Sequence, residues 1–428
     1  MSEEKKYHRR KVGNHILQPE TLMMSYGFDP ALSEGAVKIP VFQSSTFVFP
    51  SGQAGKDYFD LATGKREARE GEESGLIYSR LNNPNLQVLE ERLCLWDDAE
   101  MALSFSSGMA AISNTILTFA RPGDTIVYSQ PLYGGTGYLI EEVLPELNIT
   151  GFGFEAGKPN SHVEEVVRAA LEKGPVSLIF AETPANPTNA LVDLEFLVKM
   201  ADLVEKETGH RPPVAIDNTF LGPLWQRPLD HGCDLVIYSM TKYVGGHSDL
   251  IAGAVSGSKE MVSQIAGIRM MLGSMTDPHT AWLIMRSMET LKVRMEASTK
   301  SAKTVAEYLK DHPKVNKVHY LGFLTEDNPN YRVYKEQARG AGSTFAFEIE
   351  GGEAEAFRFL DNLKICKNAV SLGGTETLIS HPASTTHSVI DPELRDKIGV
   401  KENLVRISIG LENEDDLIAD MAGGLAAV

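Results

Sequence analysis

The sequence predicts an α/β protein in which a mainly parallel sheet, covered by helices on both faces, precedes a smaller α+β domain. Between residues 124 and 241, four short apolar, β-branched runs alternate with helical stretches, which is the pattern of strands buried in a parallel sheet. After about residue 293, helical stretches alternate with runs such as TFAFEIEG, which is typical of mixed α+β structure.

The length and charge of the chain narrow the possible partners. The chain has 428 residues, with 41 Lys+Arg against 58 Asp+Glu, and a net charge of −17. This length predicts two domains plus an arm, because a single core stops growing well below this size. The acidic balance argues against binding nucleic acid or an anionic membrane surface. The sequence contains no apolar run long enough to span a bilayer.

The cysteines and the N-terminus indicate a cytoplasmic protein. The three cysteines, Cys94, Cys233 and Cys366, are far apart and show no CxxC spacing, which argues against a disulfide framework and a structural zinc site. The start, MSEEKKYHRR, is charged and no apolar stretch follows it, unlike a secretory signal. We therefore expect a reducing compartment and no bound metal.

Three regions follow from the pattern along the chain. Residues 1–82 contain few periodic segments, and the charged stretch 56–75 reads as a solvated loop or a short helix. An arm of this kind needs a neighbour to pack against. The large domain is expected over 83–293 and the C-terminal domain over 294–428.

The elements of the two domains are expected in the following order. Helices are predicted over 85–96 and 106–120, and the second of them ends at Arg121-Pro122-Gly123-Asp124. The predicted strands of the large domain are 124–130, 176–183, 213–219 and 234–241. In the C-terminal domain, helices are predicted over 298–313 and 353–363, and strands over 344–351 and 404–412.

Lys242 is the first candidate site residue. The carboxyl ends of parallel strands form the ligand edge of such a sheet, and at these ends lie Glu182, Asp217 and Ser239-Met240-Thr241-Lys242. A lysine in a crowded, partly apolar pocket loses hydration, so that its pKa falls. A Schiff-base lysine needs this, since only the neutral amine attacks a carbonyl. The alternative is a lysine whose ammonium simply reaches solvent.

Asp217 and the segment Ser106–Met109 are candidates for binding a cofactor. Asp217 ends a predicted strand 25 residues before Lys242, and a buried carboxylate there needs a cationic partner. The pyridinium nitrogen of pyridoxal 5'-phosphate (PLP) is such a partner, although Asp217 could instead cap the following turn. The segment Ser106–Met109 opens a helix and suits a phosphate, unless the serine is only an N-cap.

Other motifs do not have the spacing that their chemistry requires. SGQAGKD (residues 51–57) has two residues where a phosphate-binding P-loop has four. FSSGM (residues 105–109) lacks the first glycine of a nucleophile elbow. His381 and His387 are six residues apart, unlike two metal ligands on one helix face, and we expect them to be loop histidines with local hydrogen bonds.

Taken together, these residues resemble the Cys/Met-metabolism family of PLP enzymes. This family includes cystathionine γ-synthase, cystathionine γ-lyase, methionine γ-lyase and O-acylhomoserine sulfhydrylase. The resemblance runs in order from about residue 38 to the C-terminus. The motifs that carry it are YSRLNNPN (78–85), SSGMAA, RPGD, PLYGGT (131–136), ETPANPT (182–188), AIDNTF, SMTKYVGGHSD (239–249), SLGGTETLISHPASTTHS (371–388) and VRISIGLE (405–412).

The resemblance implies the PLP-dependent transferase fold type I (aspartate-aminotransferase-like) and PLP as cofactor. Lys242 and Tyr133 would be the catalytic residues: Lys242 would bind PLP through a Schiff base and then move protons, and Tyr133 would stack on the ring. Asp217 would pair with the ring nitrogen. Further cofactor contacts would come from the backbone of Gly108 and Met109, the hydroxyls of Ser239 and Thr241, Asn186, and Tyr78 and Arg80 of the neighbouring subunit.

The resemblance also implies a substrate site and an assembly. Arg406 would bind the substrate carboxylate as a bidentate fork, helped by Ser371 and Asn186, and Val370 would line the substrate site. An unpaired arginine inside an apolar strand would otherwise be costly. The arm would cross into the partner of an active dimer, usually within a tetramer, so we expect a homo-oligomer that acts on a small amino-acid substrate.

The choice of reaction stays open at this point. Cystathionine enzymes typically carry Glu where this chain has Val370, which favours a methionine γ-lyase. Methionine γ-lyases usually carry Cys where this chain has Gly135, as in the γ-synthases. The charged segment 56–75 is also longer than usual for the family. We expect C–S chemistry at Cγ in transsulfuration or methionine metabolism, with replacement on an O-acylhomoserine slightly ahead of γ-elimination. A non-catalytic PLP-fold binding protein is the distant alternative.

Overall fold

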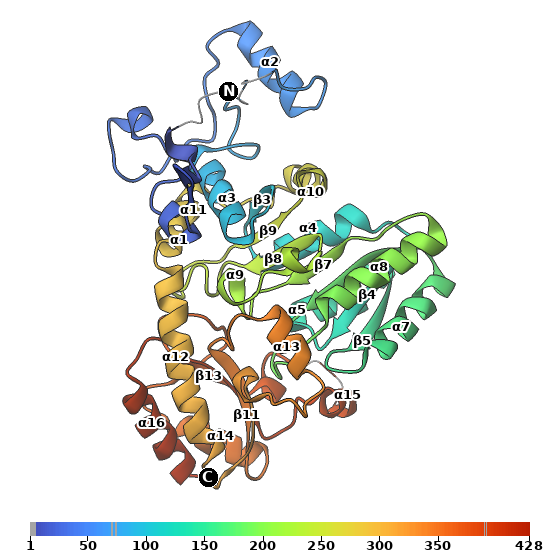
Figure 1. The fold of residues 1–428 in the computed structure, drawn as a ribbon, viewed down its shortest axis with the longest axis vertical. Coiled ribbons are helices and arrows are strands. Elements are labelled where there is room, and N and C mark those ends of the chain that lie inside the picture. The colour runs from blue at the N-terminus through green and yellow to red at the C-terminus, as the bar shows by residue number, and fades with distance from the viewer. Residues whose placement is uncertain (1–5, 70–71, 73–74, 389, 391) are drawn as a thin grey trace.

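The protein is described by a computed structural model that covers residues 6–69, 72, 75–388, 390 and 392–428. Three parts follow one another along the long axis, with the N-terminal arm at one end and the C-terminal domain at the other (Figure 1). The long helix α12 (Leu291–Lys310) runs from the central part to the C-terminal domain.

A seven-stranded sheet forms the centre of the molecule, in the order β3-β9-β8-β7-β6-β4-β5. The pairs among β4 to β8 are parallel, and β9 is antiparallel to both of its neighbours. The four predicted strands correspond to β4, β6, β7 and β8. The bounds are β3 Met101–Phe105, β4 Thr125–Gln130, β5 Thr150–Glu155, β6 Val176–Glu182, β7 Val214–Asp217, β8 Leu235–Ser239 and β9 Gly253–Gly257.

Both faces of this sheet are buried, which explains the continuous apolar runs. In β6, Leu178 and Phe180 face one hydrophobic cluster, whereas Ile179 and Ala181 face another on the opposite side. Helices α4 (Gly108–Phe119) and α10 (Lys259–Leu272) contribute to the first cluster, and α7 (Asn160–Lys173) and α8 (Leu194–Thr208) to the second. The strand ends therefore form the accessible edge.

Helices α3 and α11 cover the part of the sheet nearest the arm. Their side chains pack with buried residues of β8 and with Met23 and Phe28 of the arm. Short helical turns fill the remaining connections. The bounds are α3 Pro84–Asp97, α5 Gly134–Tyr138, the π-helical turn η3 Leu139–Val143, α6 Leu144–Glu146, α9 Gly222–Trp225, η4 Pro228–His231 and α11 Pro278–Met288.

The C-terminal domain is built on a five-stranded sheet in the order β10-β11-β14-β13-β12. All pairs are antiparallel except β12 with β13, which gives the mixed α+β structure expected from the sequence. Helices α12, α14 and α16 bury their apolar sides against this sheet. The bounds are β10 Val315–His319, η5 Leu321–Phe323, α13 Tyr331–Gln337, β11 Thr344–Ile349, α14 Glu353–Asp361, β12 Lys367–Asn368, β13 Leu378–Ser380, η6 Pro382–Ser384, α15 Pro392–Lys397, β14 Leu404–Ser408 and α16 Glu414–Ala426.

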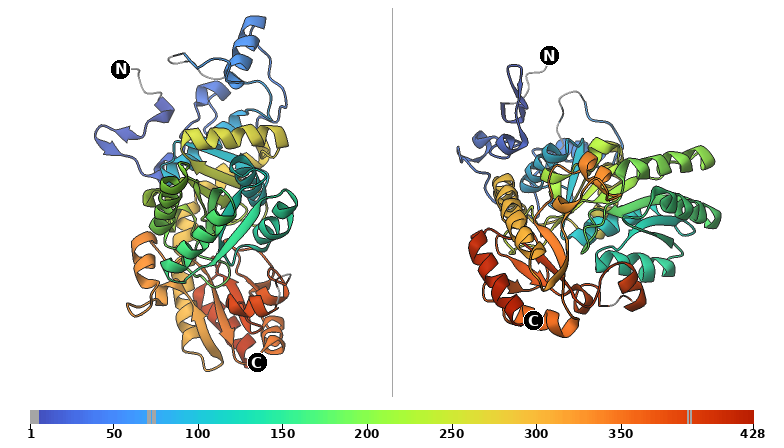
Figure 2. Two further views of the ribbon diagram at one scale, coloured as in Figure 1. Left: turned by 90° about the vertical axis from the view of Figure 1, so that its right-hand side faces the viewer. Right: turned by 60° about the horizontal axis from the view of Figure 1, so that its bottom comes forward.

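The N-terminal arm extends from the central part (Figure 2). Helix α2 covers residues 52–62, so the charged stretch 56–75 begins as a short helix and continues as a loop; residues 70, 71, 73 and 74 lie outside the described residues. Val12, Ile16, Leu32, Val37 and Val48 are largely exposed in this chain. The other elements of the arm are η1 Lys6–His8, β1 Lys11–Val12, β2 His15–Ile16, α1 Pro19–Leu22 and η2 Pro30–Ser33.

The described ranges lack a membrane-spanning helix, a disulfide and a metal-ligand group. Within them, no helix has the length and apolar character needed to cross a membrane. The three cysteines are free and buried. No group of three or more His, Cys, Asp or Glu side chains could hold a metal ion in the same part of the chain.

Candidate active site

Lys242 lies in a tight turn just beyond the carboxyl end of β8. The Lys242 backbone N–H donates to Ser239 O at 3.1 Å, and the Gly246 N–H donates to Lys242 O at 2.7 Å. Gly246 has a φ of +68°, a conformation that glycine adopts without strain. The turn therefore directs Lys242 towards the C-terminal domain.

The amine of Lys242 is buried and bound across the domains. Its Nζ donates to the Oγ of Ser371 at 2.9 Å. Burial lowers the pKa of Lys242 to about 8; the positive charge of Arg406 also lowers it, whereas Asp217 opposes this shift. A lysine with a pKa near 8 is neutral far more often at neutral pH than an ordinary lysine, as a nucleophilic amine must be.

Arg406 is a buried cation that lacks an ion pair. It lies on β14, is 3% exposed, and burial lowers its pKa to about 10. Its guanidinium donates to Asn186 Oδ1 at 3.1 Å and to Ser371 O at 2.8 Å, while its Nε has no protein partner. Among the described residues, no carboxylate forms a salt bridge with Arg406. Because an uncompensated buried charge is costly, this arrangement fits an anionic ligand such as a carboxylate.

Asp217 and Glu182 form a pair of buried carboxylates. They are the last residues of β7 and β6 and are register partners in the parallel sheet. Burial raises the pKa of both groups; for Glu182 the neighbouring Asp217 raises it further, to about 8. Neither carboxylate forms a salt bridge within the described part of the chain. Two adjacent buried carboxylates without a cation call for a positively charged ligand, and a pyridinium nitrogen meets that need.

Glu182 also holds two loops of the site. Its Oε2 accepts the backbone N–H of Tyr133 at 2.7 Å, and its Oε1 accepts the backbone N–H of Asn186 at 3.0 Å. From the sequence, Glu182 is predicted only to end a strand, and no role is predicted for it. Its place beside Asp217 at the ends of two predicted parallel strands was the signal that could have identified it.

The candidate phosphate residues lie together at the start of α4. A Cβ atom on Gly108 would lie 2.9 Å from the Cβ of Ser239, so the helix N-terminus abuts the end of β8. The N–H groups of the first helical turn have no intrahelical acceptor and can bind an anion. Ser107 acts as the N-cap through its bond from Ala110 N, and the Thr241 hydroxyl exchanges hydrogen bonds with the backbone of Ala252. Met109 follows Gly108 in the first turn.

Tyr133 lies at the start of α5, and its side chain is about half-exposed. A Cβ atom on Gly135 would lie 2.8 Å from Tyr133 Cε1 and 3.2 Å from Met109 Sδ, so residue 135 must be small for this ring position. On the other side of the loop, a Cβ atom on Gly134 would lie 2.6 Å from Thr386 O of the C-terminal domain. Both glycines thus leave no room for a side chain beside the Tyr133 ring and the Thr386 carbonyl.

Tyr78, Arg80 and Val370 lie apart from the predicted residues described above. Tyr78 and Arg80 lie in the arm, where Arg80 stacks over the Tyr78 ring at 5.9 Å and donates to Met270 O. No described contact joins either of them to the group around Lys242. Val370 precedes Ser371 and is 54% exposed, so it borders the opening rather than the buried interior.

Each of the two histidines has one local partner, as expected, but each also interacts with a residue far along the chain, Glu402 for His381 and Asn186 for His387. His381 bonds Ser384 Oγ and the Glu402 carbonyl, and His387 bonds Thr386 Oγ1. Burial and the charge of Arg406 lower the pKa of His387 to about 4, so that it is neutral. Within the described ranges, neither histidine belongs to a group of side chains that could hold a metal ion.

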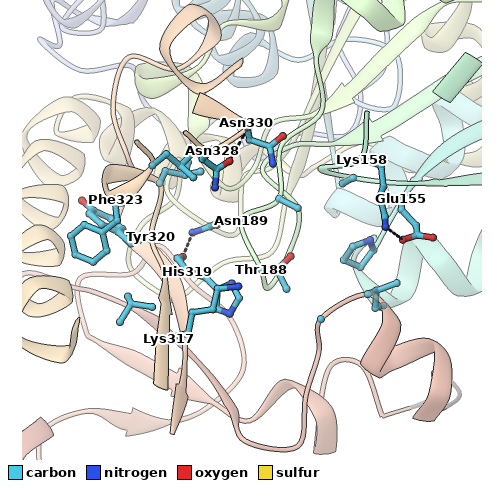
Figure 3. A pocket seen from close by; sticks show the side chains of 18 of the residues that line it. Glu155, Lys158, Thr188, Asn189, Lys317, His319, Tyr320, Phe323, Asn328 and Asn330 are labelled. Atoms are coloured by element: carbon cyan, nitrogen blue, oxygen red, sulfur yellow. Dashed lines mark hydrogen bonds and ion pairs between the residues drawn. The ribbon is translucent and has the colours of Figure 1, made fainter. Parts of the chain in front are cut away.

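A cavity of about 430 Å³ lies at a different place between the two domains (Figure 3). Glu155, at the end of β5, and Lys158 line it from the large domain, and His319, at the end of β10, lines it from the C-terminal domain. Asn189 joins the two sides by donating to His319 O at 3.0 Å. This cavity does not include Lys242, Asp217 or Arg406.

Comparison with known proteins shows the family of this chain. Residues 20–426 match the profile described as "Cys/Met metabolism PLP-dependent enzyme". The L-methionine gamma-lyase of Fusobacterium nucleatum subsp. polymorphum is 41% identical over 396 residues, which are 92% of this chain and 94% of that one. The O-succinylhomoserine sulfhydrylase of Pseudomonas aeruginosa is 35% identical, over 84% of this chain and 85% of that one.

A solved structure has the same fold. The cystathionine gamma synthase of Xanthomonas oryzae pv. oryzae, crystallised with aminoacrylate and cysteine, superposes with a TM-score of 0.84. It is 32% identical, and the match covers 96% of this chain and 98% of that one. With the large mixed sheet and the smaller second sheet, this likeness confirms the fold that the sequence resemblance implied.

Proposed function

The chain belongs to the Cys/Met metabolism PLP-dependent enzyme family, and from this premise we propose that it catalyses γ-elimination of methionine to 2-oxobutanoate, ammonia and a thiol. Its fold is the PLP-dependent transferase fold type I. It is an enzyme of methionine and cysteine metabolism that uses pyridoxal 5'-phosphate for chemistry at Cγ of a small amino-acid substrate.

The observation that carries the proposal is the position of the Lys242 amine. The amine binds Ser371, which Arg406 also binds, and it interacts electrostatically with Asp217, the neighbour of Glu182. Among the described residues, neither Arg406 nor this carboxylate pair forms a salt bridge. A substrate carboxylate would compensate the first and a protonated pyridine nitrogen the second. Arg406 thus matches the carboxylate of an amino-acid substrate, and Asp217 with Glu182 matches the ring nitrogen of PLP.

The roles of the residues follow from these positions. We assign Lys242 as the residue that holds PLP, Asp217 as the partner of the ring nitrogen, and Tyr133 as the aromatic group over the ring. The phosphate would bind at the α4 N-terminus, at Gly108 and Met109. Ser239, Thr241 and Asn186 would complete the cofactor contacts.

PLP supplies an electron sink that stabilises negative charge at the substrate Cα and Cβ. Lys242 would accept the protons that leave Cα and Cβ, return one at Cγ and leave the other for the departing thiolate, because its amine is held at the site with a pKa near physiological pH. Arg406 and Ser371 would hold the carboxylate and fix Cα above Lys242. Val370 would provide an apolar border for the methyl-thio group.

The sequence identities of the relatives support elimination as the first candidate. Methionine gamma-lyases of several bacteria are 38–41% identical to this chain, whereas the O-succinylhomoserine sulfhydrylase is 35% identical. The sequence pattern slightly favours replacement, and Gly135 still supports that second candidate because the γ-synthases carry glycine at this position. Val370 supports elimination, since an apolar side chain suits a thioether better than a distal amino group.

A substrate comparison with the PLP-loaded enzyme separates the two reactions. Methionine, cystathionine, O-acetylhomoserine and O-succinylhomoserine are each incubated with and without a thiol. Release of 2-oxobutanoate and ammonia from methionine alone is the expected result. A new thioether that forms only from an O-acylhomoserine plus thiol, with methionine inert, would replace elimination by the second candidate.

The assembly and the location are further parts of the proposal. Exposed apolar residues of the arm, and the exposed pair Tyr78 and Arg80, support an arm (1–82) that packs on a neighbouring subunit and reaches its phosphate site. The large domain would cover 83–293 and the C-terminal domain 294–428. We propose a homotetramer in the cytoplasm, consistent with three unpaired cysteines.

A further inference from the structure

We propose that Glu182 is the positioning residue of this active site, holding Tyr133 and Asn186 in a fixed arrangement beside Asp217. The inference rests on the proposed use of PLP at Lys242. It adds a role for a residue that need not touch substrate or cofactor itself and that acts through the two loops it binds.

The carboxylate of Glu182 joins two loops by accepting one backbone N–H from each. Oε2 accepts from Tyr133 at 2.7 Å and Oε1 accepts from Asn186 at 3.0 Å. The Glu182 backbone is itself fixed, because its N–H donates to Ser129 Oγ at 3.0 Å and its residue pairs with Asp217 in the sheet. The carboxylate that binds the two loops, which we call the Glu182 clamp, therefore belongs to a residue fixed within the central sheet.

The effect of the clamp extends to Lys242 through a continuous set of hydrogen bonds. Asn186 Oδ1 accepts from Arg406, Arg406 donates to Ser371 O, and Lys242 donates to Ser371 Oγ. Glu182 thus connects the loop of the aromatic ring to the groups that surround the amine. A shift of its carboxylate would move both ends of the site.

The chemistry of a carboxyl group explains why this residue is Glu. Both backbone partners are donors, so the side chain must offer an acceptor on each of its two terminal atoms. A glutamine of the same shape would point its NH2 group at one of the two N–H groups. The carboxyl is retained although it is buried next to Asp217, where a second negative charge is unfavourable; a simple packing role would not require that cost.

The test compares Glu182→Gln with a matched control, Glu155→Gln. Glu155 is also the last residue of a parallel strand of the same sheet, but it pairs with Lys397 and Lys158 and lines the separate cavity (Figure 3). Apo-protein is titrated with PLP to measure affinity, and the visible circular dichroism of the bound cofactor reports the ring environment. KM and kcat are then measured separately, and thermal unfolding monitors the fold.

Glu182→Gln is expected to unfold near the wild-type temperature, bind PLP about tenfold more weakly, and lose much of the visible circular dichroism. KM should rise, since Asn186 no longer orients Arg406. Glu155→Gln should match the wild type in all four measurements. Glu182→Asp, which keeps two acceptors on a shorter side chain, should fall between wild type and Glu182→Gln.

The proposal is overturned if Glu182→Gln keeps wild-type affinity, circular dichroism and KM, or if Glu155→Gln changes them equally. If Glu182→Gln does not fold, Glu182→Asp decides, and wild-type values in that variant overturn the proposal. The affinity and circular dichroism need no turnover. A wild type inert towards every Cγ substrate would therefore remove the proposed function and leave the result for Glu182 standing.

Discussion

The Nζ atom of Lys242 lies 2.9 Å from the Oγ atom of Ser371, so the amine at the edge of one sheet is held by a residue of the other domain. Ser371 has a φ of +95°, which is uncommon for a residue with a side chain. Strained backbone of this kind persists only where the surroundings hold it. Here the guanidinium of Arg406 donates a hydrogen bond to the backbone carbonyl of Ser371. The site is therefore closed by contact between the domains.

Replacing Lys242 should abolish the reaction and leave the fold intact. Lys242→Ala removes a buried amine whose hydrogen bond goes to one hydroxyl, so the thermal midpoint of unfolding should stay close to the wild-type value. Turnover should fall by at least about 10³-fold, and the visible absorption of bound PLP should disappear. Lys259→Ala, at an exposed position at the start of α10, is the control and should retain both.

The pH dependence of cofactor incorporation should follow Lys242. Its pKa is lowered from 10.5 to about 8, by burial first and by Arg406 second, and only the neutral amine attacks the aldehyde. The rate of PLP incorporation into apo-protein should rise with pH and level off above about 8. A rate that still rises tenfold per pH unit through pH 9 would contradict the lowered pKa.

Arg406 should affect substrate binding more than turnover. Arg406→Lys keeps a charge but loses the planar fork, so KM for methionine should rise about 100-fold with a smaller change in kcat. The measurement is steady-state kinetics with PLP-saturated enzyme. Arg358→Lys, at an exposed position on α14, is the control; an equal loss in both variants would remove the assignment of Arg406.

The carboxylate pair should make apo-protein less stable as the pH rises. Burial and Asp217 raise the pKa of Glu182 from 4.5 to about 8, so the folded state binds more protons than the unfolded state in that interval, and stability decreases with pH. Asp217→Asn removes the neighbouring charge and should flatten this slope while raising the free energy of unfolding by about 1–2 kcal/mol at pH 7.

Chemical unfolding of apo-protein at several pH values measures this slope. The same Asp217→Asn variant should lose most of its activity when loaded with PLP, because the partner of the ring nitrogen is gone. If apo-Asp217→Asn had the same free energy of unfolding and the same pH slope as the wild-type apo-protein, the two carboxylates would not interact.

Gly135 should be intolerant of a side chain because of Tyr133. In Gly135→Cys the new Cβ would meet the Tyr133 ring at 2.8 Å and Met109 Sδ at 3.2 Å, so the ring must move and kcat/KM should fall about tenfold. Gly137→Cys is the matched control, since a Cβ there has no neighbour within 4 Å. Equal activity of the two variants would mean that the ring position is not critical.

The sequence predicted the parts of the fold that depend on local patterns. Strands β4, β6, β7 and β8 are continuous β-branched runs and were recognised, whereas β5 (TGFGFE) and β9 (GAVSG) contain glycines and gave no strand signal. These segments are strands because β5 pairs with β4, and β9 pairs with β3 and β8. This pairing is a tertiary effect. The short strand β3 between two helices was missed as well.

The site was predictable where a residue ends a recognised strand. Asp217 and Lys242 follow from the strands that precede them, and the buried position of Arg406 follows from the apolar strand around it. Tyr133 came only through the family resemblance, because it lies in a loop after β4 whose position depends on tertiary contacts such as the bond from its backbone N–H to Glu182. The position of Glu182 beside Asp217 follows from the strand ends, but its role depends on the backbone N–H groups of two loops, which carry no sequence signature.

The release of 2-oxobutanoate from methionine tests the central claim most directly. PLP-loaded enzyme is incubated with methionine and no added thiol, and 2-oxobutanoate and thiol are quantified together. The account predicts equal amounts of the two products from wild-type enzyme and none from Lys242→Ala. Wild-type enzyme that leaves methionine unchanged, although PLP is bound at Lys242, would contradict the account.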